Sequence, residues 1–188
     1  AKEAGTVSTL SGGRFTLGLG IGARHDDYDE AGVDRRVRGE RLSEQLALLR
    51  TRDYPGRVLV GGSSGAAYAR MARYADGYAH GGGPPRAFAS AAARATAAWD
   101  DLGRPGRPLL WGQAYFGFGD PERGAAYLRD YYAFTGPFAE TIAAANLTTA
   151  RAVKDLARGY AAEGCDMLVL LPTVSDLAEL DRLAEVLA

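Results

Sequence analysis

The sequence has a single cysteine and no long apolar run, and each shortage argues against a class of protein. Cys165 alone cannot form an internal disulfide, so the chain does not resemble a disulfide-stabilised secreted domain. No stretch approaches the roughly 18 apolar residues of a membrane-spanning helix, and no signal-like segment is visible. These absences favour a cytoplasmic protein that does not bind a membrane.

The chain also lacks an excess of either charge. Its formal net charge is −1, which gives no basic surface for a nucleic acid and makes that partner unexpected. The apolar share of 47% and the charged share of 24% are those of an ordinary globular protein, and 188 residues suffice for one sizeable core. We therefore expect one domain over residues 1–188. The sequence starts without methionine, which suggests a trimmed or incomplete chain.

Short apolar runs alternate with stretches of helical periodicity along the chain. The pattern predicts strands at 15–19, 58–60, 77–80, 109–118 and 167–171. It predicts helices at 2–10, 36–50, 66–74, 85–102, 122–134, 137–146, 150–162 and 175–187. Strands that alternate with helices are parallel and joined by crossovers, so the expected class is α/β, either an open doubly wound sheet or part of a barrel.

The stretch RFTLGLGIGARHDDY contains Gly18-x-Gly20-x-x-Ala23 after an apolar run, a loose match to a dinucleotide-binding fingerprint. That fingerprint needs a helix that begins at the glycines, whereas the residues that follow are polar and lack helical periodicity until about Arg36. We therefore interpret these glycines as allowing a flat ligand or another backbone to approach the strand end. A tight rim turn without a ligand is the alternative of equal weight.

The second glycine-rich segment is a stronger signal. An apolar strand leads into Gly61, Gly62, Ser63 and Ser64, and a helix follows at once. This order places backbone N–H groups and two hydroxyls at a helix N-terminus, where phosphate is favoured. The loop lacks the Gly-Lys-Ser/Thr ending of a P-loop, so triphosphate chemistry is not indicated. The alternative is a plain glycine turn with Ser64 as N-cap.

Other candidate residues give weaker signals. His80 follows a short strand, where it either contacts a cofactor or forms a hydrogen bond at the rim. His25 stands beside Asp26 and Asp27, but we expect a solvated loop there and no metal site. No Ser-His-Asp or Cys-His arrangement is visible, so catalytic residues are not identified. The aromatic residues of YLRDYYAF are expected to pack a helix on its neighbours rather than to form a partner or lid surface.

Several segments together resemble the bacterial luciferase-like family of flavin- and coenzyme F-420-dependent oxidoreductases. The segments are STLSGGRFTLGLGIG, DEAGVDRRVRGERLSEQLALLR, VLVGGSSGAAYARMARYADGY, YLRDYYAFTGPFAE and GCDMLVLLPTVSDLAELDRLAEVL. The resemblance implies a (β/α)₈ barrel whose site lies at the carboxyl ends of the strands. It places Gly20, Ile21 and Gly22 beside the ring system of the cofactor and Gly61–Ser64 around its phosphate. We add His80 to the candidate cofactor contacts because of its position after a strand.

The resemblance also implies an incomplete barrel, because about five of eight strands are present and the N-terminal part of the family pattern is missing. The expected function is an FMN- or coenzyme F-420-dependent oxidoreductase or monooxygenase that acts on a small-molecule substrate. NAD(P)H or a separate reductase would supply electrons, and the chain would form a homodimer. The alternative is a non-catalytic flavin-binding or structural relative that has lost part of the barrel.

Overall fold

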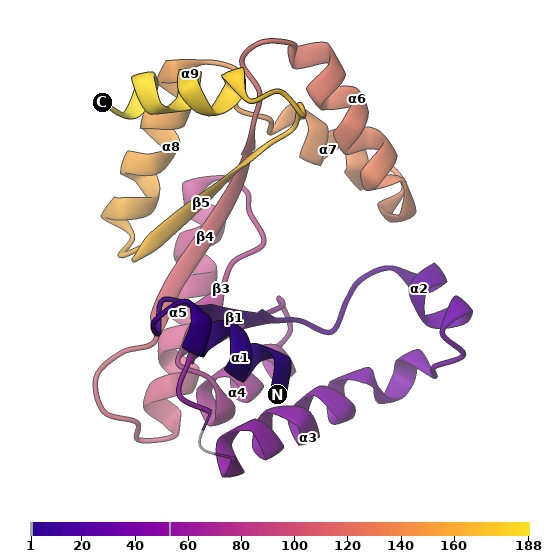
Figure 1. Ribbon diagram of the computed structural model, residues 1–188, viewed down its shortest axis with the longest axis vertical. Coiled ribbons are helices and arrows are strands. Elements are labelled where there is room, and N and C mark those ends of the chain that lie inside the picture. Colours follow the sequence, from indigo (N-terminus) through magenta and orange to yellow (C-terminus); the bar gives the residue numbers. More distant parts are fainter. Residues whose placement is uncertain (1, 53) are drawn as a thin grey trace. The chain divides into compact units, whose positions relative to one another are not determined.

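The computed structural model describes residues 2–52 and 54–188, in which parallel strands alternate with helices (Figure 1). The strands are β1 (Thr16–Leu19), β2 (Arg57–Gly61), β3 (Gly77–Ala79), β4 (Leu109–Phe116) and β5 (Met167–Pro172). Their order in the sheet is β1-β2-β3-β4-β5. The predicted α/β class with five parallel strands is therefore confirmed.

Helices precede and connect these strands. The α-helices are α1 (Lys2–Leu10), α2 (His25–Glu30), α3 (Arg38–Thr51), α4 (Gly65–Tyr74), α5 (Pro85–Asp101), α6 (Pro121–Tyr131), α7 (Phe138–Ala144), α8 (Ala150–Ala162) and α9 (Ala178–Leu187). Two 3₁₀ turns, η1 (Arg35–Val37) and η2 (Ala133–Thr135), lie before α3 and after α6.

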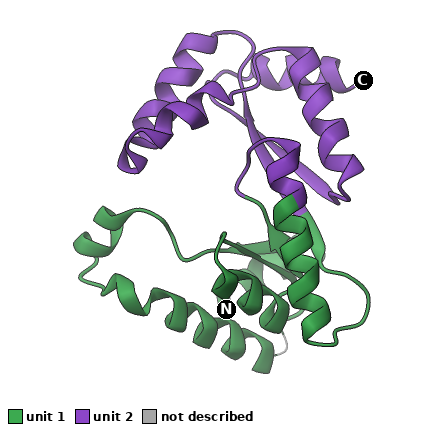
Figure 2. Ribbon diagram, turned by 180° about the vertical axis from the view of Figure 1, so that it is seen from behind, with its two compact units in different colours: residues 1–80, 90–110 green, residues 81–89, 111–188 purple. Residues whose placement is uncertain are grey.

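The chain divides into two compact units, which Figure 2 distinguishes by colour. Unit 1 contains residues 1–80 and 90–110, and unit 2 contains residues 81–89 and 111–188. Each unit has its own buried residues, and each is described by itself below. The single domain expected over residues 1–188 stays a prediction.

Unit 1 is built on β2, which pairs in parallel with β1 and with β3. Val58, Leu59 and Val60 are at most 2% exposed, as expected for a parallel strand that is covered on both faces. Helix α4 packs on β2, and α3 packs on α4. The buried faces of the two helices consist of small and apolar side chains at helical spacing: Leu42, Leu46, Leu49, Ala67, Tyr68, Met71 and Ala72.

Unit 2 contains β4 and β5, which pair in parallel from Trp111↔Met167 to Phe116↔Pro172. Helices α6 and α7 lie between β4 and α8 and pack on each other. The chain returns beside the end of β4, where Leu147 forms a parallel bridge with Phe116. The α6–α7 segment is therefore an excursion that leaves and rejoins the carboxyl end of one strand.

One helix was not predicted, and several predicted boundaries are wrong, among them that of the strand expected to reach residue 118, which ends at Phe116. Helix α2 forms before Arg36, where no helix was expected; none of its residues is buried, so it carries no apolar periodicity. The helix expected to reach residue 134 ends at Tyr131, and η2 follows. The last helix begins at Ala178 rather than at 175, although the side chain of Asp176 accepts a hydrogen bond from its first N–H group at 3.0 Å.

Candidate functional site

The carboxyl ends of β1, β2 and β3 meet at one edge of unit 1. The register pairs Leu19 with Val60 and Gly61 with Ala79. The next residue along β1 is Gly20, beside Gly61, and the next after β3 is His80. The structure therefore brings the three sequence-predicted segments, 20–22, 61–64 and residue 80, to neighbouring strand ends, where α/β proteins bind ligands.

The backbone at Gly62 requires glycine. Its φ of 127° lies in a region that other residues rarely adopt, and a Cβ there would stand 2.8 Å from the Cβ of Ala67. The buried hydroxyl of Tyr78 donates a hydrogen bond to the Gly62 carbonyl oxygen at 2.9 Å. Burial, together with Tyr68, raises the pKa of Tyr78, so this phenol stays protonated and remains a donor. The Tyr78 hydroxyl thus fixes the position of the loop that contains Gly62.

Helix α4 begins directly after this loop, and Ser64 is its N-cap. The Ser64 side chain accepts a hydrogen bond from the Ala67 N–H group at 3.2 Å, so the N-cap named in the alternative interpretation of this loop is present. The N–H groups of Gly65 and Ala66 lie in the first turn of α4, where N–H groups have no acceptor within the helix. Both residues are exposed, as is Ser63. The first turn of α4 therefore presents N–H groups and the Ser63 hydroxyl to solvent, the arrangement that binds phosphate at helix N-termini.

The loop from Gly20 to Gly22 is fixed by α2. The Tyr28 hydroxyl donates a hydrogen bond to the Ile21 carbonyl oxygen, and Gly22 adopts a φ of 72°. The guanidinium of Arg38 lies 5.8 Å from the centre of the Tyr28 ring. A Cβ on Gly20 would meet no atom within 4 Å, so protein packing does not require a glycine there. Open space beside a backbone is what a flat ligand needs.

The dinucleotide fingerprint is not supported by α2. A Rossmann helix packs on the sheet, whereas α2 has six residues, none of them buried. His25, Asp26 and Asp27 all lie on α2, and Arg24 pairs with both carboxylates. The hydrogen bond from Arg24 lowers the pKa of Asp26. Among residues 2–52 and 54–188, no group of three His, Cys, Asp or Glu side chains could hold a metal.

His80 is partly buried and lies near the aromatic pair beneath the loop. Its ring centre is 6.3 Å from that of Tyr78, which in turn lies 5.1 Å from Tyr68 of α4. Cys165 lies far along the chain, just before β5, and burial raises the pKa of its thiol. A raised pKa disfavours the thiolate, so Cys165 is poorly suited to act as a nucleophile.

Two contacts of the site were missed by sequence reasoning. Tyr28 binds a carbonyl seven residues before it, and Tyr78 binds one sixteen residues before it. Both bonds depend on tertiary placement, and neither tyrosine stands in a motif. No local signal could have identified them.

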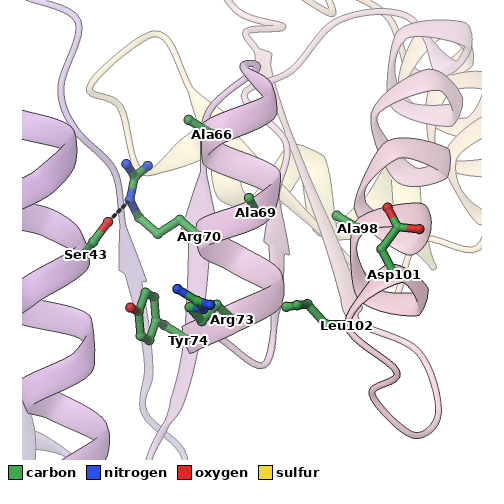
Figure 3. Close-up of a pocket in the computed structure, with 9 residues that line it drawn as sticks. All are labelled: Ser43, Ala66, Ala69, Arg70, Arg73, Tyr74, Ala98, Asp101 and Leu102. Carbon is green, nitrogen blue, oxygen red and sulfur yellow. Dashed lines mark hydrogen bonds between the residues drawn. The ribbon is translucent and has the colours of Figure 1, made fainter.

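A cavity of about 580 Å³ lies elsewhere in unit 1, over the outer face of α4 between α3 and α5 (Figure 3). Arg70 crosses toward α3, where it donates hydrogen bonds to the Ser43 hydroxyl at 3.0 Å and to the Gly39 carbonyl at 2.9 Å. None of the predicted site residues lines this cavity. Its lining residues are Ser43, Ala66, Ala69, Arg70, Arg73, Tyr74, Ala98, Asp101 and Leu102.

None of the helices in the part of the chain that the structure describes combines the length and the apolar character needed to cross a membrane.

Comparisons with known proteins point to one group. Residues 1–52 match the model of a family described as luciferase-like monooxygenase. The uncharacterized protein Mb0965c of Mycobacterium bovis is 37% identical over 109 residues, which cover 45% of this chain and 38% of that protein. The uncharacterized protein Rv0940c of Mycobacterium tuberculosis matches to the same extent. The chain thus spans well under half the length of the curated relatives it matches.

Solved structures show the same fold at low identity. An F420-dependent secondary alcohol dehydrogenase matches with a TM-score of 0.74 and 12% identity, over 94% of this chain and 69% of that chain. The EDTA monooxygenase of Chelativorans sp. BNC1 matches with a TM-score of 0.70 and 15% identity, over 98% of this chain and 68% of that chain. A coenzyme F420-dependent tetrahydromethanopterin reductase of Methanopyrus kandleri matches with a TM-score of 0.54 and 12% identity, over 91% of this chain and 72% of that chain.

These findings confirm the resemblance inferred from the sequence motifs. The family model covers the first glycine-rich segment with the helices around it, and the structural matches extend over almost the whole chain. Over residues 1–52 the chain matches the luciferase-like monooxygenase family, and over almost its whole length it shares the fold of these solved structures.

Proposed function

We propose that the protein is an oxidoreductase that binds FMN or coenzyme F-420 at the strand ends of unit 1 and acts on a small organic substrate. The observation that carries the proposal is the register of β1, β2 and β3, which brings three separate segments to one edge. Two of these segments have the features that a phosphate and a flat ring system require. NAD(P)H or a partner reductase would supply the electrons, and the protein would act as a homodimer.

The phosphate of the cofactor would bind at residues 61–65. Gly62 allows the backbone to turn toward the ligand, and a Cβ at that position would stand only 2.8 Å from the Cβ of the buried Ala67. The exposed N–H groups of Gly65 and Ala66 and the Ser63 hydroxyl are donors, and the positive end of the α4 dipole favours an anion. The Tyr78 hydroxyl bond to the Gly62 carbonyl holds the loop without using these donors.

The ring system would lie against Gly20, Ile21 and Gly22. Gly20 is exposed and has open space where its side chain would stand, so a planar ring can approach the backbone. The hydrogen bond from Tyr28 to the Ile21 carbonyl keeps that carbonyl from turning toward the ring. His80, at the end of the third strand, would contact the cofactor from the other side of the phosphate loop.

When bound, either cofactor supplies hydride chemistry, and a flavin can also react with O₂. The contribution of this chain is to bind and orient the cofactor at a strand edge. Support for an oxidoreductase rather than another ligand-binding protein comes from the names of the structural matches, among which are dehydrogenase, monooxygenase and reductase. Those matches share 12–15% identity with this chain, so they bear on fold and leave the activity as a proposal.

The experiment is a titration of the full-length protein with FMN and, separately, with coenzyme F-420, followed by absorbance and fluorescence. NAD(P)H or reduced F-420 is then added and oxidation is followed with and without O₂. We expect saturable binding of one cofactor and cofactor-dependent turnover. Binding without turnover would replace the enzyme by a cofactor-binding relative, and absence of binding by both cofactors would refute the proposal.

A further inference from the structure

The α6–α7 excursion of unit 2 carries a row of aromatic side chains. The row consists of Tyr115 at the end of β4, Tyr127 and Tyr131 on α6, Tyr132 after it, and Phe134 in η2. The sequence predicted that the aromatic residues of YLRDYYAF, residues 127–134, pack a helix on its neighbours. That prediction is wrong for Tyr127 and Tyr131, which are each 46% exposed, and Phe134 is 37% exposed.

The helix does not use this row to pack on α7. Its buried residues are Gly124 and Leu128, which share one face at a spacing of four, and a Cβ at Gly124 would stand 2.4 Å from the Thr173 hydroxyl. The buried residues of α7 are Ala139 and Ala143. The Arg129 side chain pairs with Glu140 at 2.7 Å and links the two helices from outside. These contacts fix the excursion without Tyr127 and Tyr131, so packing within the excursion does not explain why these two rings are exposed.

The rings form a connected corner rather than a scatter of single side chains. Tyr127 and Tyr131 stack with ring centres 5.9 Å apart, and the ring of Tyr132 stands at 83° to that of Tyr131, 4.9 Å away. Tyr132 is 6.0 Å from Phe134 and 6.1 Å from Tyr115. Two ring planes near a right angle can hold a flat molecule, one by stacking and one by its edge.

The row ends in a pair of phenols that has a donor to spare. The hydroxyl oxygens of Tyr115 and Tyr132 are 2.6 Å apart, and either can donate. Two phenols carry two protons, and their mutual bond uses one, so one O–H group remains to bind an acceptor. Burial, with the hydrogen bond from Tyr132, raises the pKa of Tyr115, which keeps that proton in place at neutral pH. Both residues are only half-buried.

We propose that this row is a binding site for a planar aromatic molecule that bears a carbonyl or similar hydrogen-bond acceptor. The ligand ring stacks in the corner between Tyr131 and Tyr132, and its acceptor takes the spare proton of the Tyr115–Tyr132 pair. The site lies at the carboxyl end of β4, where the excursion leaves and rejoins the strand. It belongs to unit 2 and does not rest on cofactor binding in unit 1.

The test titrates the full-length protein, with and without FMN, by calorimetry with three probes. These are 1-acetylnaphthalene, 1-ethylnaphthalene, which lacks the acceptor, and acetylcyclohexane, which lacks the flat ring. We expect the acetylnaphthalene to bind about tenfold or more tightly than either of the others, the effect of one buried hydrogen bond or of one lost stacking contact. Equal affinity for the two naphthalenes, or binding of none, overturns the proposal.

Two variants locate the binding. The double variant Tyr115→Phe/Tyr132→Phe keeps both rings and removes both hydroxyls together, so neither is left without its partner; it should lose the preference for the acetyl probe. Tyr131→Leu should weaken the binding of both naphthalene probes. The matched control is Phe138→Leu, which removes a ring of α7 that lies outside the row and is 59% exposed, and it should change nothing.

Circular dichroism of each variant checks the fold. If Phe138→Leu weakens probe binding as much as Tyr131→Leu does, the assignment is overturned. It is also overturned if no probe binds and Tyr131→Leu converts a wild-type dimer to a monomer. If no cofactor binds in unit 1, these experiments still test the aromatic site, because the probes are also titrated without FMN.

Discussion

At the scale of single residues, Glu179 is the best-defined buried charge in unit 2. The side chain is fully buried, and its two oxygens accept hydrogen bonds from the N–H groups of Phe118 at 2.6 Å and Gly119 at 2.8 Å. Arg182 pairs with it one turn further along α9. The carboxylate therefore ties α9 to the turn that leads from β4 into α6, which positions the excursion that bears the aromatic row.

Replacement of this carboxylate should destabilise the fold in a pH-dependent way. Burial alone would raise the pKa of Glu179, but the two N–H donors and Arg182 outweigh it, and the pKa is lowered. A lowered folded-state pKa stabilises the protein above the unfolded value of about 4.3, and this stabilisation is lost as the pH falls through the folded value. Glu179→Gln should cost about 1.5–3 kcal/mol at pH 7, since one N–H group then faces an amide NH₂.

The measurement is urea unfolding of both proteins across pH 3–7 (a range of about four units around the reference pKa). The difference in unfolding free energy between wild type and variant should shrink at the acid end, where the wild-type carboxylate is itself protonated. A difference that stays constant over the whole range would show that the charge of Glu179 contributes nothing.

At the scale of elements, the N-terminus of α4 allows a test that separates binding from folding. Gly65 is the first residue of α4, has an ordinary φ, and has no atom within 4 Å of its Cβ position. Gly65→Asp should therefore stabilise the helix through its dipole while repelling phosphate, so thermal stability rises slightly and cofactor affinity falls about tenfold or more. Gly65→Ala is the matched control and should bind normally.

The more obvious variant, Gly62→Asp, is the poorer test. The positive φ at Gly62 and the 2.8 Å approach to Ala67 mean that it would strain the loop as well as repel an anion. A Gly65→Asp protein that binds the cofactor with unchanged affinity would remove residues 61–65 as the phosphate site, whatever its stability.

The elements also show how far the sequence could predict this fold. Helix α4 was predictable because the strand, the glycines, the Ser64 cap and the buried face stand next to one another in the chain. Helix α2 was not, because all six of its residues are exposed and no apolar periodicity marks it. Helix α6 was predicted too long because the aromatic residues from Tyr131 onward look like a continued apolar face, although the chain turns into η2.

The candidate site divides in the same way. Gly61, Gly62 and Ser64 can be recognised from a local motif. Tyr28 and Tyr78, which fix the loops, act through contacts that form only in the folded chain. The exposure of the aromatic row could not be predicted either. A tyrosine at helical spacing is consistent with burial or with a surface, and in the folded chain the buried face of α6 is the one that carries Gly124 and Leu128.

At the scale of the whole molecule, the fold is better defined than the activity. The chain aligns with 38% of its mycobacterial relative and with 68–72% of the solved structures described above. The sequence motifs indicated the luciferase-like family because glycine-rich strand ends can be recognised from the sequence alone. Substrate and electron donor depend on side chains around the bound molecules, which a strand-and-glycine pattern does not specify.

The most direct test of the central claim is the ratio of two dissociation constants for the full-length protein. FMN and riboflavin differ only by the phosphate that residues 61–65 should hold. Coenzyme F-420 and its phosphate-free deazaflavin chromophore form a second pair, which differs by the phosphate and by the acidic tail attached to it. We predict that the phosphorylated member of one pair binds about tenfold or more tightly, the worth of one charge-assisted hydrogen bond. Equal dissociation constants within both pairs would contradict a phosphate cradle at the N-terminus of α4.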